Sequence, residues 1–126
     1  MKYEILEHKA DLKIKVFGKT KEELFKNALS AMTESQKGEN FGDRVKRKIK
    51  IQSVDLVDLL VDFLSEALYL SQVKKEIYSD VKFKKFSDIG IEGELIGQKI
   101  ERFGEDIKAV TYHNLNIIER ENRIWV

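Results

Sequence analysis

The amino-acid sequence predicts an α+β fold, a single compact domain in which two main helices cover a mixed, largely antiparallel sheet. Three observations support this prediction: a long segment with helical periodicity at residues 55–70, several short segments with strand-like alternation, and the order of these segments. The order is strand, strand, helix, strand, helix, and then strands to the end. It lacks the regular strand–helix alternation of a doubly wound parallel sheet, and it favours helices packed on an antiparallel sheet.

Residues 55–70 form the segment around which the rest of the chain is organised. At helical pitch most of its surface is apolar, so we expect a helix that is mostly buried, with one polar stripe in water. Asp58, Asp62 and Glu66 follow one another on that stripe, and like charges at this four-residue spacing destabilise a helix by about 0.2–0.5 kcal/mol per pair. We call these three residues the acidic edge. Either its carboxylates keep the helix soluble, or they meet a basic group of another element or another molecule.

The composition excludes several classes of protein. The chain has 126 residues, of which 42% are apolar and 36% charged, as in a globular domain. The formal net charge of +1 is too balanced for a dedicated nucleic-acid binder. The absence of cysteine excludes disulfides, thiolate zinc sites and cysteine nucleophiles. The sequence begins without a signal-peptide core and contains no candidate membrane span, so a soluble, cytoplasmic protein is expected.

The first elements are two short strands and a helix. The strands are predicted at residues 3–6 and 12–16, on either side of the polar sequence HKAD at residues 8–11. Thr20 and Glu23 have the spacing of a capping box, in which the threonine side chain accepts a hydrogen bond from the backbone N–H of Glu23. An amphipathic helix is therefore expected to begin directly after Thr20.

A basic strand precedes the central helix. Apolar residues alternate with lysines over residues 45–52, and Arg47 falls on the apolar side, where it needs an edge location or a charge partner. Ser53 or Asp55 is expected to cap the central helix, because each offers a side-chain oxygen to its free N–H groups. Residues 74–79 are expected to close that helix.

The remaining segments are predicted as strands and turns. Gly90 and Gly93 within one strand indicate a bulge or a close backbone approach. Alternating lysines could place one positive face on the sheet, but the near absence of aromatic residues among them favours protection against aggregation over base stacking. The predicted strands are 81–86, 89–95, 109–118 and 124–126, the turns are 98–106 and 119–122, and the lysines are Lys13, Lys15, Lys46, Lys48, Lys50, Lys82, Lys84 and Lys85.

Few residues offer catalytic chemistry. The sequence contains no phosphate-binding P-loop and no G-x-S-x-G nucleophile elbow. Asp11 is a candidate ligand for a hard cation such as calcium or magnesium; the alternative is a turn cap beside a surface His8. His113 lies on the apolar face of its predicted strand, where a hydrogen-bonded core histidine is the commoner case. If the first and last strands pair, His8, Asp11 and His113 form one cluster.

Four collinear motifs carry a resemblance to a known family. They are HKAD at 8–11, GKTKEELF at 18–25, DLVDLLVDFLSE at 55–66 and IKAVTYH at 107–113. Together they resemble the archease family over nearly the whole chain. The resemblance implies a non-catalytic accessory protein of tRNA splicing, which activates an RtcB-type, GTP-dependent RNA ligase by promoting its guanylylation and turnover. It also implies, as an alternative, a modulator or chaperone of a tRNA methyltransferase.

The resemblance further implies a bound divalent cation, typically calcium. Asp11 matches the aspartate of the family's H-x-A-D motif and is the one metal ligand that carries over. The other family ligands are an aspartate next to the C-terminus and the terminal residue, after a final strand that follows a tryptophan like Trp125. We expect a single archease-like domain over residues 1–126. Because the sequence ends at Val126, either that strand is not represented in it or this member of the family lacks it.

Several hypotheses about function therefore stay open. As a ligase activator, the chain would contact its partner or support its site through a small set of polar residues, and RNA would be reached only through the partner. As a methyltransferase modulator, it would bind that enzyme through a salt-sensitive interface. As a metal-dependent enzyme, it would use His8 and Asp11 with His113 as general base. The partner-contacting or site-supporting candidates are His8, Asp58, Asp62, Glu66 and His113.

Overall fold

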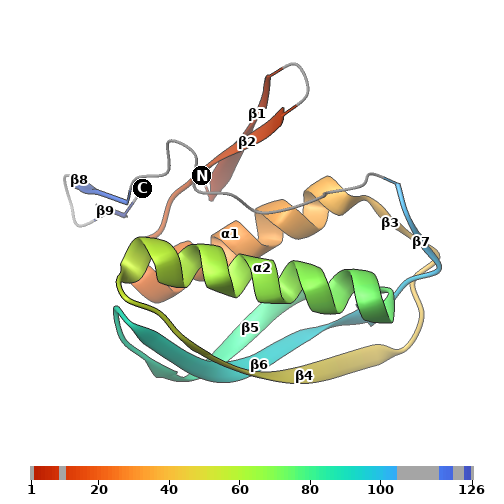
Figure 1. Ribbon diagram of the computed structural model, residues 1–126. Helices are drawn as coiled ribbons and strands as arrows, with labels where there is room; N and C mark the ends of the chain where they lie inside the picture. The colour runs from red at the N-terminus through yellow and green to blue at the C-terminus, as the bar shows by residue number, and fades with distance from the viewer. Residues whose placement is uncertain (1, 9–10, 105–116, 121–123, 126) are drawn as a thin grey trace.

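A computed structural model describes residues 2–8, 11–104, 117–120 and 124–125, of which residues 6–8, 11–14, 120 and 124–125 are described by their backbone alone. Figure 1 shows two helices lying on the same face of a three-stranded sheet, with short hairpins at the periphery. The predicted α+β fold is confirmed. The elements are β1 (Tyr3–His8), β2 (Asp11–Val16), α1 (Lys21–Gln36), β3 (Gly38–Glu39), β4 (Arg44–Gln52), α2 (Leu56–Lys74), β5 (Glu76–Phe86), β6 (Gly90–Lys99), β7 (Arg102–Phe103), β8 (Glu119–Arg120) and β9 (Ile124–Trp125).

The main sheet has the strand order β4-β6-β5, so the last of these strands in sequence lies between the other two. Three two-stranded sheets accompany it, formed by β1 with β2, β3 with β7, and β8 with β9. Every strand pair among the described residues is antiparallel. Neither described helix is long and apolar enough to cross a membrane.

Both helices begin at a side-chain cap. The Thr20 hydroxyl accepts a hydrogen bond from the Glu23 N–H at 3.0 Å, which confirms the predicted start of α1. Asp55, rather than Ser53, caps α2, since its carboxylate accepts from the Asp58 N–H at 2.8 Å. Each capping oxygen satisfies one of the N–H groups that the first turn leaves without an intrahelical partner.

The end of α2 differs from the prediction. The helix ends at Lys74, and Lys75 adopts the left-handed conformation with φ 52°, after which β5 begins at once at Glu76. Left-handed residues commonly end helices, and here the reversal directs the chain back under α2. The segment predicted to close the helix is therefore mostly strand.

Other boundaries also shift. β6 runs on to Lys99 and β7 follows at Arg102, so the segment 98–106 is less irregular than predicted. Glu119 belongs to the short hairpin strand β8 rather than to a turn. Of the strand predicted at 109–118, residues 109–116 lie outside the described part of the chain.

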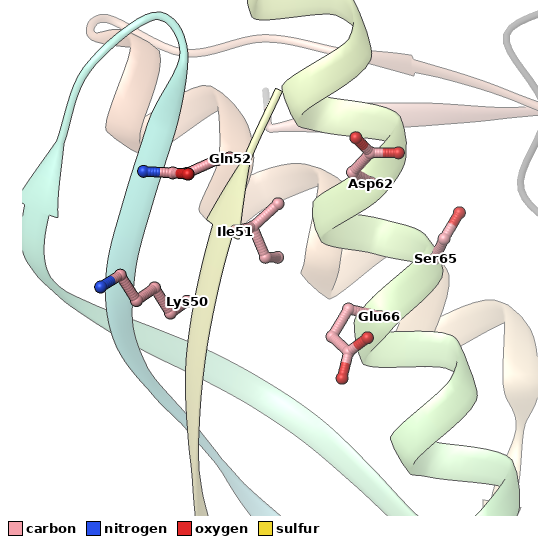
Figure 2. Close-up of a pocket in the computed structure, with 6 residues that line it drawn as sticks. All are labelled: Lys50, Ile51, Gln52, Asp62, Ser65 and Glu66. Atoms are coloured by element: carbon pink, nitrogen blue, oxygen red, sulfur yellow. The ribbon is translucent and has the colours of Figure 1, made fainter. Parts of the chain in front are cut away.

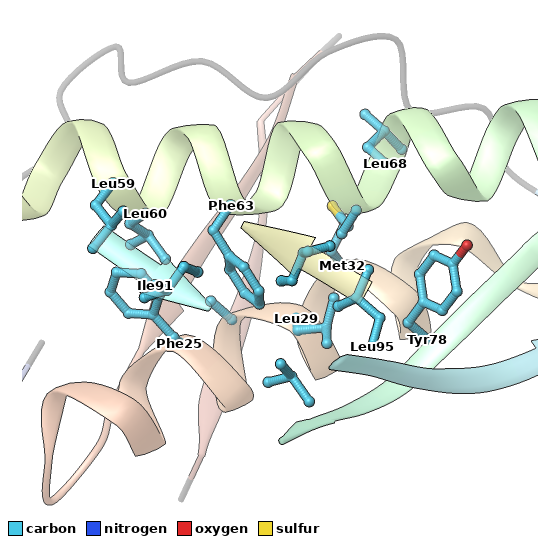
Figure 3. Packing of buried hydrophobic residues seen from close by; sticks show 14 of the residues in the cluster. Phe25, Leu29, Met32, Leu59, Leu60, Phe63, Leu68, Tyr78, Ile91 and Leu95 are labelled. Carbon is cyan, nitrogen blue, oxygen red and sulfur yellow. The ribbon is translucent and has the colours of Figure 1, made fainter. Parts of the chain in front are cut away.

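The core lies between the helix pair and the sheet, as Figure 3 shows. Phe63 of α2 is fully buried, with its ring centroid 5.6 Å from that of Phe25 in α1 and 6.0 Å from that of Phe83 in β5. The predicted buried character of the central helix is confirmed. Its fully or nearly fully buried residues are Leu59, Leu60, Val61, Phe63, Ala67, Leu68 and Ser71.

Two glycines of β6 allow β5 to approach closely. A Cβ at Gly93 would stand 2.3 Å from the carbonyl oxygen of Lys82, and one at Gly97 would stand 1.8 Å from that of Ile77. The register between β5 and β6 shifts next to both positions, at Tyr78/Asp80 and at Phe83/Lys85. The predicted bulge or close approach is therefore confirmed at Gly93, with the irregularity on the partner strand, whereas Gly90 has only ordinary contacts.

Replacing Gly97 by alanine is expected to lower the free energy of unfolding by about 1–3 kcal/mol or more, because the new methyl group collides with backbone that cannot yield cheaply. Gly90→Ala is the matched control in the same strand, since its Cβ would meet the nearest atom at 3.5 Å, an ordinary contact. Urea unfolding followed by circular dichroism measures both. Equal midpoints for the two variants would contradict the predicted collision.

Candidate functional site

The acidic edge of α2 is the candidate site. Asp62 is exposed, while Asp58 and Glu66 are half-buried, so all three carboxylates reach the surface of the helix layer. Among the described residues, none of the three forms an ion pair. Within that described part of the chain, the negative charge of the edge is not compensated, and the opposite side of its helix is anchored in the core.

A hydrogen bond fixes the most exposed of these carboxylates. The Ser53 hydroxyl, which lies just before α2, donates to Oδ2 of Asp62 at 2.5 Å. Ser53 thus serves the acidic edge and not the helix cap. A bond from a neutral donor orients the Asp62 carboxylate without supplying a positive charge beside it.

A shallow hollow of about 430 Å³ lies between α2 and β4. Figure 2 shows Asp62, Ser65 and Glu66 on the helix side, and Ile51 of β4 pointing toward the helix. Lys50 and Gln52, also in the lining, extend to the other side of the strand in the same view. The hollow therefore offers carboxylate and hydroxyl oxygens above an apolar floor. Such a surface suits a basic side chain of a partner, whose stem would cover the isoleucine.

The acidic edge does not by itself amount to a metal centre. Calcium requires six to eight oxygen ligands, usually several of them carboxylates. Within the described residues there is no group of three or more acidic or histidine side chains placed to hold a metal ion. In that part of the chain the acidic edge therefore does not supply a calcium shell.

The HKAD motif forms the end of the β1–β2 hairpin. His8 and Asp11 are the last paired residues of its register, directly opposite each other across the two strands. The backbone thus brings together two of the three residues of the predicted cluster, although their side chains are not described. His113 lies outside the described residues, so its place in that cluster stays a prediction.

A buried ion pair, only partly foreseen from the sequence, links the two edge strands of the main sheet. Glu76 of β5 is fully buried, and Arg47 of β4 binds it with two hydrogen bonds, Nε to Oε1 at 2.9 Å and Nη2 to Oε2 at 2.5 Å. The Tyr78 hydroxyl donates to Oε1 at 2.8 Å, and the Lys99 Nζ lies 3.8 Å from Oε2. Arg47 therefore has the charge partner that its position required. The partner itself was missed, because Glu76 lies in the segment assigned to the helix end.

The network shifts the pKa values of its members. The hydrogen bond from Arg47 lowers the pKa of Glu76 below its ordinary 4.5, against the effect of burial. Burial, followed by the bond to Glu76, raises the pKa of Tyr78. At neutral pH Glu76 is thus ionised and Tyr78 is protonated. This is the state that a structural network needs, because Arg47 and Tyr78 donate hydrogen bonds and the Glu76 carboxylate accepts them.

A second buried chain of hydrogen bonds joins this network to the helices. The Gln36 amide donates to the Ser71 hydroxyl at 2.9 Å, and that hydroxyl donates to the backbone carbonyl of Glu76. The end of α1, the last turns of α2 and the start of β5 are therefore tied together beneath the surface. These contacts hold α2, and with it the acidic edge, in one position relative to the sheet.

Comparison with known proteins agrees with this architecture. The Archease protein family (MTH1598/TM1083) matches residues 3–126. The chain is 36% identical to Protein archease of Methanosarcina barkeri, covering 91% of this chain and 85% of that protein. It is 30% identical to Protein archease of Pyrococcus furiosus, covering 98% of this chain and 93% of that protein.

Two solved structures share the fold. The solution structure of Methanobacterium thermoautotrophicum protein 1598 superposes with a TM-score of 0.71 at 25% identity, covering 98% of this chain and 92% of the other. The crystal structure of a Thermotoga maritima protein described as an archease, possible chaperone, gives a TM-score of 0.67 at 23% identity, covering 95% of this chain and 88% of the other. With a family match over residues 3–126 and relatives at least 30% identical that cover most of both chains, this chain belongs to the archease family.

Proposed function

We propose that this protein is a non-catalytic accessory factor of tRNA splicing, which activates an RtcB-type RNA ligase by promoting its guanylylation and turnover. Family membership carries the proposal, and the matched residues 3–126 include the whole acidic edge. In this view the protein works by binding, and RNA reaches the complex through the ligase.

The acidic edge is the proposed contact with the ligase. Its carboxylates lack ion-pair partners among the described residues, and they stand on a helix anchored by the core and by the Gln36–Ser71 bond. A rigid, uncompensated charged surface loses little conformational entropy on binding and speeds association with a basic surface. The expected counterpart is therefore a cluster of arginine or lysine residues on the ligase.

Asp11 is the proposed ligand for a divalent cation, calcium being the first candidate. The support is its place in the H-x-A-D motif, opposite His8 at the end of the hairpin. One carboxylate is far from a complete calcium shell. The remaining ligands would come from outside the described residues or from the partner.

A role as chaperone or modulator of a tRNA methyltransferase is the second candidate. It is supported by the description of the Thermotoga maritima relative as a possible chaperone. Both roles require a binding surface and no catalytic group. They differ in the partner that co-purifies and in the reaction that responds.

In the deciding experiment, the cognate ligase is incubated with labelled GTP, without RNA, and the formation of ligase–GMP is followed with and without this protein. Wild-type protein at stoichiometric amounts is expected to accelerate guanylylation. Asp62→Asn is expected to raise the protein concentration needed for half-maximal acceleration about tenfold, equivalent to about 1.4 kcal/mol, because it removes one charge of the contact. Glu22→Gln, which removes an exposed carboxylate from α1, is the matched control and should behave as wild type.

Asp11→Asn in the same assay tests the cation. The variant should accelerate ligase guanylylation only about as much as wild type does when calcium is removed with a chelator. Added calcium should not restore the acceleration. An unchanged rate with wild-type protein would refute ligase activation altogether. A normal response of Asp62→Asn would instead remove only the acidic edge from the contact.

A further inference from the structure

The outer face of the main sheet, opposite the helices, concentrates positive charge. Ile49 is buried in β4, and Val45 and Ile51 pack against the core, so the residues that alternate with them, Lys46, Lys48 and Lys50, point to the other side. Figure 1 shows both helices on the inner face and no described element over the outer one. The basic residues on this face are Arg44, Lys46, Lys48 and Lys50 of β4 and Lys82 and Lys85 of β5.

The middle strand neutralises these cations only in part. Glu94 lies between Lys48 and Lys82 in the strand register, and Glu92 lies between Lys50 and Lys85. Each glutamate thus stands between two lysines, which leaves one positive charge in excess per row. In the third row, Ile96 of β6 lies between Lys46 of β4 and Asp80 of β5. The Asp80 carboxylate lies 4.0 Å from the Lys26 ammonium group of α1.

The predicted single positive face is therefore wrong in its extent, though right for two strands. Lys13 and Lys15 belong to the separate β1–β2 hairpin. The net charge of +1 also conceals a separation of charge, with carboxylates on the edge of α2 and lysines on the outer face of the sheet. An overall balance near neutrality thus does not exclude a local polyanion contact.

The composition and charge spacing of this face suit a phosphate backbone better than a protein partner. Protein interfaces are depleted of lysine and centred on aromatic anchors, and the outer-face positions named above include no aromatic residue. The β4 cations recur every second residue, at about 6.7 Å, over roughly 20 Å, and the lysines of β5 run parallel to them about 10 Å away. Two rows of lysine charges without stacking groups match a dense line of phosphates and carry no means of reading bases.

We propose that the outer face of the β4-β6-β5 sheet binds the phosphate backbone of RNA, weakly and without regard to sequence. The inference rests on the proposed function, which makes RNA the polyanion that is present during the reaction. The ligase would deliver the RNA, and this face would add direct phosphate contacts to it. The glutamates of β6 keep such contacts weak enough for release.

Fluorescence anisotropy with a labelled uridine 20-mer tests the proposal on the full chain, without ligase. Binding at about 50 mM salt should weaken as salt rises, with a slope of log K against log salt of about −2 to −3, as expected for three to four phosphate contacts on a single strand. The triple variant Lys46→Gln, Lys48→Gln and Lys82→Gln should lose at least tenfold in affinity and most of that slope. The triple variant Lys2→Gln, Lys19→Gln and Lys74→Gln changes the net charge equally at exposed positions off this face, and it should stay within about twofold of wild type.

Three results would overturn the proposal: no salt-dependent binding by wild type, an equal loss in both triple variants, or equally tight binding of poly-glutamate through the same lysines. The last would identify an acidic protein segment as the occupant. Urea midpoints of the variants confirm that all are folded. The guanylylation assay contains no RNA, so the sheet-face variant should retain full acceleration there, and failure of ligase activation is distinguishable from failure of RNA binding.

Discussion

Replacing Arg47 by methionine is expected to lower the free energy of unfolding by about 3–5 kcal/mol, the usual result of breaking a buried ion pair from one side. The substitution keeps the aliphatic stem and removes the two strongest donors to Glu76, whose carboxylate is fully buried. Tyr78 and Lys99 remain nearby but supply only one hydrogen bond and a 3.8 Å contact. Urea unfolding at neutral pH measures the effect.

The complementary variants make this test specific to charge. Glu76→Gln should cost less, because the freed guanidinium of Arg47 is about one-third exposed and can turn to water. The double variant should recover much of the loss of Arg47→Met, since no buried charge then remains. A loss below about 1 kcal/mol in Arg47→Met, or an additive double variant, would show that the pair is not coupled.

Acid should weaken the same interaction. The pKa of Glu76 is lower in the folded protein than its ordinary value of 4.5, so the stability from this group is present above pH 4.5 and is lost as pH falls through the folded pKa. Wild type should therefore lose stability below about pH 4.5 more steeply than Glu76→Gln. Unfolding midpoints between pH 3 and pH 7 provide the comparison.

Replacing Phe63 by alanine is expected to cost about 3–5 kcal/mol, as other large-to-small changes at fully buried aromatic positions do. The ring stands between Phe25 and Phe83, so its loss opens a cavity between α1, α2 and β5 at once. Tyr69→Ala is the matched control on the same helix, because that side chain is 59% exposed, and it should change stability by less than about 0.5 kcal/mol. Thermal and urea unfolding measure both variants, and similar losses in the two would contradict the assigned orientation of α2.

The fold was predictable where one local signal dominated. The apolar surface of residues 55–70 identified both the central helix and the side of it that is buried, because a helix of that composition has no other way to remove its apolar surface from water. Thr20 and Glu23 located the start of α1 for an equally local reason, a specific hydrogen bond. Such features depend only on residues that are close in sequence, so they can be recognised from one amino-acid sequence.

The missed features depend on contacts between distant segments. Glu76 reads as a polar residue near a helix end, and it meets Arg47 only because β4 and β5 both pair with β6. The left-handed Lys75 is equally hard to foresee, since lysine has no special preference for that conformation. At the candidate site, the pattern located the acidic edge, whereas the Ser53 bond to Asp62 required the path of the chain before α2.

The Arg47–Glu76 pair also has a consequence for how the sheet assembles. β4 alternates lysines with apolar residues, so a slip of one position along β6 would turn Lys46 and Lys48 into the core and carry Arg47 out to solvent. The slipped sheet would leave the buried Glu76 without the two hydrogen bonds from Arg47. The pair thus penalises misaligned sheets more than it strengthens the aligned one, and it selects a single pairing for a strand whose simple repeat would otherwise tolerate several.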